Sequence, residues 1–451
     1  MALMFFPRGG SAQVARYVAR ALPGAGWDVT LVAGSLGDSD EASNAEVFFK
    51  GVEDLRTVDY TAARDAPDPL AADPPFQPSF EDRTDAPDRV FASVSDEDFE
   101  RLVSTWEGVL GDAGAADADV LHLNHLTPMN EAAARSFPDV PVIGHLHGTE
   151  LLMLKAIEDG PPEGWTHASA WAERMRAWAQ RCERLLVLSP DAVERVPALL
   201  DVDPERVIWA PNGFEPDAFD RRPKEGAERR ELWRRWLVEE PRGWDPDQDC
   251  KPGTVRYHDD DLDLLDGTVL VYSGRYTEVK RLPLLIRAFA RAWSRFDGPA
   301  ALVLIGGYPG EWEGEHPLEV VRSIDARGVF LAGWRGHDDL PDGLNASDAV
   351  VLPSVHEQFG QVLVEGMACG LPCVAVDAHG PATIVDDGST GWLVPPDDED
   401  AMADALVEVV NDPDERRSRG EAAYGVARER YSWPALVEKM AAVYEEVRGG
   451  S

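Results

Sequence analysis

Short apolar runs alternate with longer amphipathic segments along the first half of the chain. The runs have the length and β-branched content of buried strands, and the segments repeat their apolar residues at helical spacing. Because strands that alternate with helices pair in parallel, this pattern predicts an open parallel sheet with helices on both faces. The clearest strands are predicted at residues 27–33, 119–123, 140–146 and 185–189, and the clearest helix at 12–22.

The second half repeats the alternation and predicts a second domain of the same class. With 451 residues, of which 44% are hydrophobic, the chain is long enough for two domains of ordinary size. No apolar run approaches the roughly 20 residues that span a bilayer. The predicted strands are 268–273, 301–305, 329–332, 349–352 and 373–376, and the predicted helices include 282–296 and 400–410.

Two segments of the first half break this pattern. Residues 65–88 are rich in Asp and Pro, which predicts an extended loop that is mobile or acts as a lid. Residues 160–178 carry three tryptophans, Trp165, Trp171 and Trp178. We assign neither segment to the predicted sheet.

A third irregular segment, residues 221–265, lies between the two predicted domains. It contains a basic amphipathic stretch with two tryptophans, residues 229–236, followed by an acidic tract at 259–263. Such a helix binds a membrane or an anionic acceptor in some proteins. We favour the interpretation that it packs its tryptophans against its own protein, and that the acidic tract is a solvated loop.

The charge balance excludes two classes of partner. Lysine and arginine number 43 against 82 aspartate and glutamate residues, which gives a net charge of −39. A field of this sign disfavours nucleic acid and anionic membranes, because both require a basic footprint. Either a salt-rich cytoplasm, where ions screen the self-repulsion, or a bias in genome composition accounts for the acidity. The first residues, 1–7, lack the charged flank of a signal peptide and predict a first strand in a cytoplasmic protein.

The cysteines and histidines predict neither disulfides nor a metal site. Four cysteines spread over the chain are not a disulfide framework, and Cys369 and Cys373 are interpreted as small buried residues. His122, His125, His145 and His147 lie at strand ends, but no carboxylate accompanies them at ligand spacing. We interpret His122 and His125 as satisfied buried imidazoles, and His147 as a candidate ligand-binding residue because ligands bind at the carboxyl ends of parallel strands.

The strongest chemical signal lies in residues 354–372. Glu357 and Glu365 stand eight positions apart, where a predicted strand leads through a loop with Gly360 into a helix. A helix that begins after such a loop presents backbone N–H groups to an anion. Carboxylates beside an anion site suit a ligand that carries both hydroxyls and phosphate, as a sugar nucleotide does.

Two further turns supply what an anionic ligand needs. Gly274 and Arg275 follow the strand at 268–273, and Lys280 stands in the same loop, so the two cations are able to clamp a diphosphate. Gly9 and Gly10 join the first strand to the first helix, where the absence of side chains allows close approach of a bound group. The spaced-glycine dinucleotide fingerprint is absent.

In order and spacing, these motifs resemble the donor site of retaining glycosyltransferases of the GT-B fold, specifically the large family 4. The resemblance is dense over residues 268–411 and looser over the first half. It implies two doubly wound Rossmann-like α/β domains that face each other across a cleft. The expected division is an acceptor domain at 1–215, a linker or insertion at 216–265 and a donor domain at 266–432, with a helix at about 433–451 packed back on the first domain. The motifs that carry the resemblance are Gly274-Arg-x4-Lys280, Glu357-x7-Glu365, residues 332–334, 348–353 and 388–394, and in the first half 9–11, 147–149, 188–190 and 211–213.

The resemblance also implies residue roles. Arg275 and Lys280 would stabilise the leaving diphosphate, Glu357 would hold sugar hydroxyls, and Glu365 would hold the ribose. His147 would stabilise the oxocarbenium-like centre or bind a hydroxyl. Backbone groups of the donor loop would contact phosphate or sugar, and the glycines of the first turn would let the domain close over the diphosphate. The donor-binding set is Gly9, Gly10, Gly274, Phe359, Gly360, Gln361, Val362 and Glu365.

The implied chemistry is retaining transfer of a hexosyl or N-acetylhexosaminyl group from an NDP-sugar to a hydroxyl. A phosphate oxygen would take the proton of the acceptor, so neither a paired-carboxylate arrangement nor a metal cofactor is expected. The alternatives are an inactive sugar-nucleotide-binding regulator of the same fold and a nicotinamide-dependent oxidoreductase. The first turn and residues 147–150 are similar to those of transferases that glycosylate small acids, but small-molecule, lipid and glycan acceptors all stay open, as does homodimerisation.

Overall fold

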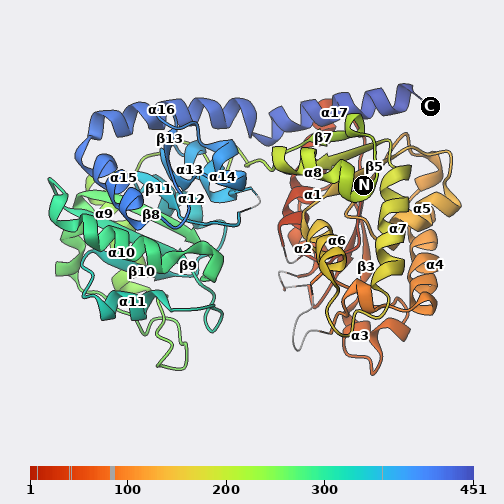
Figure 1. Cartoon of the computed structure of the whole chain (residues 1–451), viewed down its shortest axis with the longest axis horizontal. Helices are drawn as coiled ribbons and strands as arrows, with labels where there is room; N and C mark the ends of the chain where they lie inside the picture. Colours follow the sequence, from red (N-terminus) through yellow and green to blue (C-terminus); the bar gives the residue numbers. More distant parts are fainter. Residues whose placement is uncertain (8, 40, 42, 82–86, 358, 451) are drawn as a thin grey trace. The chain divides into compact units, whose positions relative to one another are not determined.

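The chain forms two compact α/β units in the computed structural model (Figure 1). The structure describes residues 1–7, 9–39, 41, 43–81, 87–357 and 359–450. Unit 1 combines residues 1–212 with 433–451, and unit 2 comprises residues 213–432. The chain therefore passes from one unit to the other twice, and each unit is described by itself.

Unit 1 is built on a parallel sheet of seven strands in the order β3-β2-β1-β4-β5-β6-β7. The order reverses between β1 and β4, which lie side by side in the middle of the sheet. In doubly wound sheets, ligands bind at the carboxyl ends of the strands at this reversal. The strands are β1 Ala2–Leu3, β2 Thr30–Ser35, β3 Asp54–Asp59, β4 Leu121–Asn124, β5 Val142–Leu146, β6 Arg184–Val187 and β7 Val207–Trp209.

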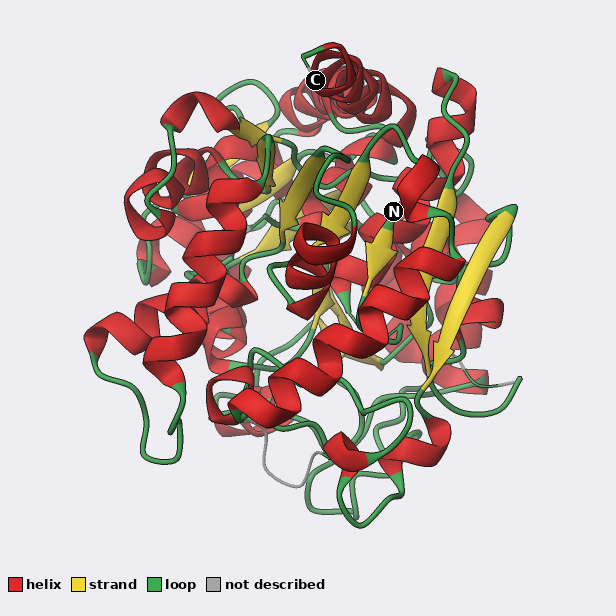
Figure 2. Cartoon of the chain, turned by 90° about the vertical axis from the view of Figure 1, so that its right-hand side faces the viewer, coloured by secondary structure: helices red, strands yellow, loops and turns green. Residues whose placement is uncertain are grey.

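Helices cover both faces of this sheet, as Figure 2 shows with unit 1 turned toward the viewer. The arrangement follows from the right-handed crossovers that parallel strands require. The longer helices are α1 Gly10–Ala21, α4 Asp96–Asp112, α5 Pro128–Ser136, α6 Thr149–Asp159, α7 Ala168–Arg181 and α8 Pro190–Leu200. The short helices are η1 Leu22–Ala25, α2 Ala45–Phe48, α3 Thr61–Arg64, η2 Pro69–Ala71, η3 Phe91–Ser93, η4 Ala115–Asp117 and η5 Pro204–Arg206.

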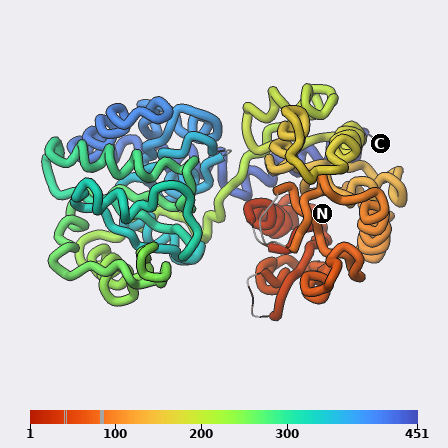
Figure 3. Tube along the Cα trace, turned by 60° about the horizontal axis from the view of Figure 1, so that its bottom comes forward, coloured from red at the N-terminus to blue at the C-terminus, as the bar shows by residue number. Residues whose placement is uncertain are grey.

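The last helix, α17 (Trp433–Gly449), belongs to unit 1 although it follows unit 2 in sequence. Figure 3 shows this blue segment returning to the red and yellow part of the chain. Trp433 stacks on Tyr17 of α1 at 5.6 Å between ring centroids, and Tyr444 joins the same apolar cluster. Burial of these aromatic side chains holds the end of the chain against α1.

Unit 2 contains a parallel sheet of six strands in the order β10-β9-β8-β11-β12-β13. Here the order reverses between β8 and β11. The strands are β8 Thr268–Gly274, β9 Ala300–Gly306, β10 Val329–Gly333, β11 Ala349–Leu352, β12 Cys373–Val376 and β13 Gly391–Val394. The helices are α9 Gly226–Arg234, η6 Arg235–Glu239, η7 Asp259–Asp266, η8 Glu278–Lys280, α10 Leu282–Ala292, η9 Trp293–Arg295, α11 Pro317–Ser323, α12 Leu340–Asn345, α13 Gln361–Ala368, α14 His379–Ile384, α15 Glu399–Asn411 and α16 Pro413–Arg430.

Residues 216–265, predicted as a linker or insertion, fall within unit 2, and several of their side chains belong to its core. Trp233 and Trp236 are 0% and 2% exposed, so the tryptophans of the basic stretch pack on their own protein as favoured. The arginines of α9 pair with carboxylates, including Arg230 with Asp263 at 2.9 Å. The acidic tract predicted as a solvated loop is therefore the helix η7, held by these ion pairs.

Of residues 65–88, predicted as an extended loop or lid, 82–86 lie outside the described residues, and the described part buries side chains in unit 1. Phe76, Gln77 and Phe80 are 1%, 0% and 6% exposed. Phe80 packs edge-on against Phe5 at 6.0 Å between ring centroids, and the backbone N–H of Phe6 donates to Gln77 Oε1 at 2.9 Å. The aromatic residues scattered among Asp and Pro explain the difference, because each adds a large apolar area to the core.

Candidate functional site

The carboxyl ends of β8 and β11 in unit 2 bring together the predicted donor residues. These strands are hydrogen-bonded neighbours, so their following loops lie side by side. The backbone N–H of Val355 donates to Val279 O at 3.0 Å, which ties the two loops together. Lys280, from the first loop, forms an ion pair with Glu357 from the second, and their side chains are only 17% and 20% exposed. The sheet order thus brings together two half-buried charged side chains that lie 77 residues apart in sequence.

Gly274 and Arg275 end β8 beside this pair. A Cβ at Gly274 would lie 2.7 Å from the hydroxyl of Tyr272, so glycine is required there. The same hydroxyl donates to Arg275 O at 2.7 Å and holds the turn. The Arg275 side chain is exposed, whereas Lys280 is half-buried. Among the described residues, the turn therefore offers an exposed guanidinium without an ion-pair partner and an ammonium that is already paired with a carboxylate.

Gly360 forms the N-cap of α13 with φ of 103°, a left-handed conformation that glycine adopts without strain. Gln361 and Val362 are the first residues of the helix, so their N–H groups are among those that have no acceptor within the helix. Phe359 is buried and its ring lies 6.0 Å from that of Tyr431. The backbone at the start of α13 is therefore fixed and points donor groups outward, which favours an anion at this position.

Glu365 lies one turn into α13 and is only 3% exposed. The Gln361 side chain donates from Nε2 to Glu365 Oε1 at 3.1 Å and to Gly213 O at 2.8 Å. Burial raises the pKa of Glu365 to about 8, because a charged carboxylate is poorly solvated there. Glu365 is therefore protonated at neutral pH, and a ligand with hydroxyl donors would favour its ionised form.

In unit 1, the predicted glycine turn precedes and opens α1. Gly9 and Gly10 are both exposed, and a Cβ built on either meets no heavy atom within 4 Å. The fold itself thus does not require glycine at these positions. The space beside the turn is open, and the role of these glycines in close approach of a ligand stays a prediction.

His147 directly follows β5 and is half-buried. Its Nε2 lies 2.9 Å from Asn124 Oδ1, and its backbone N–H donates to Glu150 Oε1 at 3.0 Å. The rings of His145 and His125 each lie 4.5 Å from its own. Burial and the neighbouring histidines hold the pKa of His147 well below its usual value, so the imidazole is neutral at physiological pH.

The other three histidines have different surroundings. His122 Nδ1 contacts the Tyr444 hydroxyl and its Nε2 lies 3.2 Å from His145 Nδ1, so His122 is satisfied as predicted. His125 contacts Glu150 Oε2 through Nδ1 at 3.3 Å, but its Nε2 is buried and has no hydrogen-bond partner in the described structure. The prediction of a satisfied imidazole is thus right for His122 and wrong for one nitrogen of His125. Within the described residues, no group of three or more His, Cys, Asp or Glu side chains has an arrangement suited to a metal ion.

Sequence reasoning missed Asn124 and Glu150, which position the histidines. Asn124 ends β4 and is 0% exposed, and Glu150 begins α6 and is 0% exposed. A polar residue at the end of a buried strand is the one signal that would have identified Asn124, since side chains there face the ligand edge.

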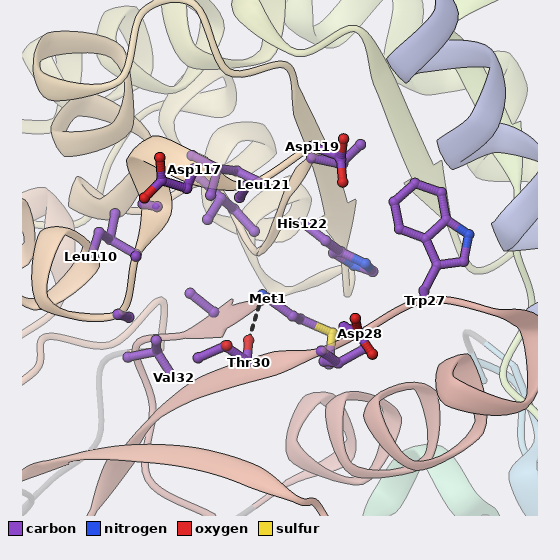
Figure 4. Close-up of a pocket in the computed structure, with 18 of the residues that line it drawn as sticks. Met1, Trp27, Asp28, Thr30, Val32, Leu110, Asp117, Asp119, Leu121 and His122 are labelled. Atoms are coloured by element: carbon purple, nitrogen blue, oxygen red, sulfur yellow. Dashed lines mark hydrogen bonds between the residues drawn. The ribbon is translucent and has the colours of Figure 1, made fainter.

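A cavity of about 360 Å³ in unit 1 lies at the opposite edge of the sheet (Figure 4). It is lined by residues at the amino ends of β1, β2 and β4, and there the amino group of Met1 donates to Thr30 O at 2.8 Å. Trp27 and His122 border the same space (Figure 4). Because ligands of doubly wound sheets bind at the carboxyl edge, this cavity is not the candidate active site.

Comparison with known families agrees with this geometry. Residues 259–426 match the family described as glycosyl transferases group 1, and residues 8–218 match glycosyltransferase family 4. The kanosaminyltransferase of Streptomyces kanamyceticus is 31% identical over 186 residues, 40% of this chain and 46% of that one. The N-acetylglucosaminyl L-malate synthase of Bacillus anthracis is 30% identical over 181 residues, 40% and 45% of the two chains. The D-inositol 3-phosphate glycosyltransferase of Kribbella flavida is 36% identical over 186 residues, 40% and 43%. The matches thus span less than half the length of these relatives.

Solved structures extend the similarity to the whole chain. Sucrose-phosphate synthase from Thermosynechococcus elongatus superposes with a TM-score of 0.65 at 19% identity, covering 100% of this chain and 96% of that one. HepE of Anabaena in complex with UDP-glucose gives 0.63 at 17% identity, covering 99% and 98%. These similarities confirm the predicted GT-B fold of two Rossmann-like units. No helix among the described residues is long and apolar enough to cross a membrane.

Proposed function

Because the chain belongs to family 4 of the glycosyltransferases, the glycosyl transferases group 1, we propose that it is a retaining hexosyltransferase. It moves a hexosyl or N-acetylhexosaminyl group from an NDP-sugar to a hydroxyl acceptor. The observation that carries the proposal is the Lys280–Glu357 ion pair beside Arg275 and the start of α13. This set joins cations for a diphosphate with a carboxylate for sugar hydroxyls. The UDP-glucose complex of HepE, a protein of the same fold, supports a uridine nucleotide as the first donor to test.

Arg275 and Lys280 neutralise the negative charge that develops on the diphosphate as the C1–O bond of the donor breaks. Glu357 has two functions in this proposal, since it orients the Lys280 ammonium and accepts hydrogen bonds from sugar hydroxyls. The N–H groups at the start of α13 donate to the phosphate or the sugar. Because these groups are held in place before the donor binds, little reorganisation is needed as the charge moves.

Glu365 accepts hydrogen bonds from the ribose hydroxyls once it has lost its proton. In unit 1, His147 contacts a hydroxyl of a bound ligand. A phosphate oxygen of the leaving group takes the proton of the acceptor, so the residues supply no general base and the reaction requires no metal.

A donor panel tests the proposal. Purified protein is incubated with UDP-, GDP- and ADP-sugars and with a metabolite extract of the source organism, and products are identified by mass spectrometry. We expect one donor class to be consumed and its sugar to appear on a new product, with the anomeric configuration of the donor retained by NMR. Tight binding of a donor without nucleotide release would support the alternative, an inactive sugar-nucleotide-binding regulator.

The variants Lys280→Ala and Glu357→Ala locate the activity. Both side chains are partly exposed, so their loss is compatible with a folded protein. Arg287→Ala is the matched control, because Arg287 forms an exposed ion pair with Glu315 in the same unit. Full activity of either site variant would refute the assigned site, whereas equal losses in all three would indicate a general effect of charge removal.

A further inference from the structure

The cavity at the amino edge of the unit 1 sheet is enclosed by parts of the chain that lie far apart in sequence (Figure 4). The amino ends of β1, β2 and β4 contribute to its wall, together with the segment between α4 and β4 and with Tyr444 of α17. Its volume of about 360 Å³ falls within the range of small-molecule sites, which starts at roughly 300 Å³. The cavity is therefore large enough for a compact ligand, and it lies away from the carboxyl edge that carries His147.

Aliphatic side chains form much of the cavity wall. A ring or hydrocarbon chain placed there leaves water and gains contact with these side chains. Trp27 borders the same space and is half-buried. The guanidinium of Arg448 lies 5.4 Å from the centre of the Trp27 ring and is itself paired with Glu445. The buried apolar residues of the lining include Val32, Leu110, Leu121 and Leu123.

The polar groups inside the cavity are predominantly neutral at pH 7. His122 and Tyr444 are both buried and are hydrogen-bonded to each other. Burial, together with the neighbouring His145, holds the pKa of His122 well below its usual value, and burial raises the pKa of Tyr444. The amino group of Met1 donates to Thr30 O, and burial lowers its pKa to about 6. The interior thus presents little positive charge that would repel a cation.

The charged groups around the cavity are carboxylates. Asp28 precedes β2, Asp117 ends η4 and Asp119 precedes β4, and all three are exposed. Figure 4 shows Asp28 on one side of the space and Asp117 and Asp119 on the other. Within the part of the chain that the structure describes, none of the three forms an ion pair or a side-chain hydrogen bond, and the lining contains neither lysine nor arginine. The field at the cavity therefore favours a cation.

We propose that this cavity binds a small organic cation, with its apolar body in the interior and its ammonium or guanidinium group toward Asp28, Asp117 and Asp119. An anion of the same size would face three like charges, and a neutral molecule would gain only the apolar contact. Because Tyr444 lines the cavity, the bound cation also contacts α17 and holds it against β4. Binding at this edge of the sheet is independent of the proposed glycosyl transfer.

Three probes of similar size and different charge test this preference in the full-length protein. They are 2-phenylethylammonium, 2-phenylethanol and 3-phenylpropanoate, titrated by ligand-observed NMR at pH 7 in 0.1 M KCl. We expect the ammonium to bind about tenfold more tightly than the alcohol, and the carboxylate to bind most weakly, because three carboxylates act together near the surface. In 1 M KCl, screening reduces the tenfold preference to about threefold or less. Equal dissociation constants for the three probes, or tightest binding of the carboxylate, would overturn the proposal.

Charge variants locate the bound cation. Asp117→Asn combined with Asp119→Asn removes two of the three carboxylates and is expected to lower the preference for ammonium over alcohol from about tenfold to about two- or threefold. Glu53→Gln combined with Glu205→Gln is the matched control, because both glutamates are exposed on the same unit and lie outside the lining of the cavity. We expect this control to keep the wild-type preference. An equal loss in the two double variants would mean that the net charge of the chain attracts the cation, and it would refute the site.

A larger side chain tests whether the apolar body occupies the interior. Ala118 lines the cavity and is half-buried, so Ala118→Phe fills part of the space. We expect this variant to weaken binding of both the ammonium and the alcohol by about tenfold or more, because the apolar contact of both is lost. Unchanged binding of both probes to a folded Ala118→Phe variant would contradict the proposal.

Hydrogen exchange of the wild-type protein gives a second location and does not depend on the folding of any variant. We expect 2-phenylethylammonium to protect peptides of α17 and of residues 113–123, which both contribute to the wall, and 3-phenylpropanoate at the same concentration to leave them unchanged. Binding of the ammonium without protection of these peptides would place it elsewhere on the chain and refute the assignment.

Discussion

Glu365→Gln removes the buried carboxyl of α13 while keeping its shape. The amide oxygen still accepts from Gln361 Nε2, so the packing around position 365 is preserved. In the wild type, the folded pKa of about 8 lies above the ordinary value of 4.5. A raised folded pKa means that the stabilising contribution is fully present below pH 4.5 and is lost as the pH rises toward 8.

The size of this change in stability follows from the interval between the unfolded and folded pKa values of Glu365. Each pKa unit corresponds to 1.36 kcal/mol, which gives about 5 kcal/mol over the full window and about 3 to 4 kcal/mol between pH 5 and pH 8. The glutamine variant does not titrate and lacks this dependence. We therefore expect its free energy of unfolding to rise relative to wild type by about 3 to 4 kcal/mol over the same interval.

Urea unfolding is monitored by hydrogen exchange of peptides from α13, so the free energy of unfolding is measured for unit 2 alone. Glu429→Gln is the control, because Glu429 is exposed on α16 of the same unit. Parallel pH profiles for Glu365→Gln and wild type would refute the reasoning, since they would mean that Glu365 ionises at an ordinary pH. A pH-dependent difference in Glu429→Gln would instead point to net charge as the cause.

The same titration makes donor binding pH-dependent. If the ribose hydroxyls donate to the ionised carboxylate, binding releases a proton below pH 8. The affinity for UDP then falls by about tenfold for each pH unit below 8, a dependence that Glu365→Gln does not show. Calorimetry in two buffers of different ionisation enthalpy measures the released proton, and no release at pH 7 would contradict the assignment of Glu365 to the ribose.

Five further changes have defined outcomes. Lys280→Ala and Glu357→Ala each lower kcat by roughly 10²- to 10³-fold with unchanged circular dichroism, the cost of losing one preorganised charge or donor; near-normal kcat in either would refute the assigned site. Trp236→Ala lowers the stability of unit 2 by about 3 to 5 kcal/mol, because Trp236 is 2% exposed in its core; unchanged unfolding would mean that residues 216–265 do not contribute to the stability of that core. EDTA leaves turnover unchanged, since Arg275 and Lys280 take the place of a cation, and restoration of lost activity by Mg²⁺ or Mn²⁺ would disprove this. Raising KCl from 0.1 to 1 M raises the unfolding temperature because it screens the repulsion of a net charge of −39; a lower temperature would count against self-repulsion as a limit on stability.

The sequence alone determined the elements that carry their own apolar pattern. Residues 349–352 and 373–376 were predicted as strands and form β11 and β12 with the same bounds. Central strands are buried on both faces, so their hydrophobic runs are unmistakable. The three strands that were not predicted, β3, β7 and β13, lie at sheet edges. The fourth edge strand, β10, is buried along its whole length and was predicted from its apolar run.

Some properties of the predicted donor residues were likewise readable from the sequence, and others were set only by the tertiary structure. The types and spacing of Arg275, Lys280, Glu357 and Glu365 are local and were readable as a diphosphate and sugar site. Only the tertiary structure decided that Lys280 pairs with Glu357 and that Glu365 lies buried with its pKa raised to about 8. Both facts depend on the order β8-β11 and on burial, to which residues distant in sequence contribute.

In unit 1 the tertiary structure decided more. The sequence identified His147 as a candidate because it follows a strand, but its side-chain hydrogen bond is to Asn124 of β4, which in turn donates to Ala2 O of β1. Those strands meet only because the sheet order places β1 beside β4, and α17 reaches His122 through Tyr444 from the far end of the chain. Hydrophobic periodicity therefore reveals which segments form strands and helices, whereas the protonation and pairing of the site residues are set by long-range contacts, because hydrogen bonds and desolvation depend on neighbours in space.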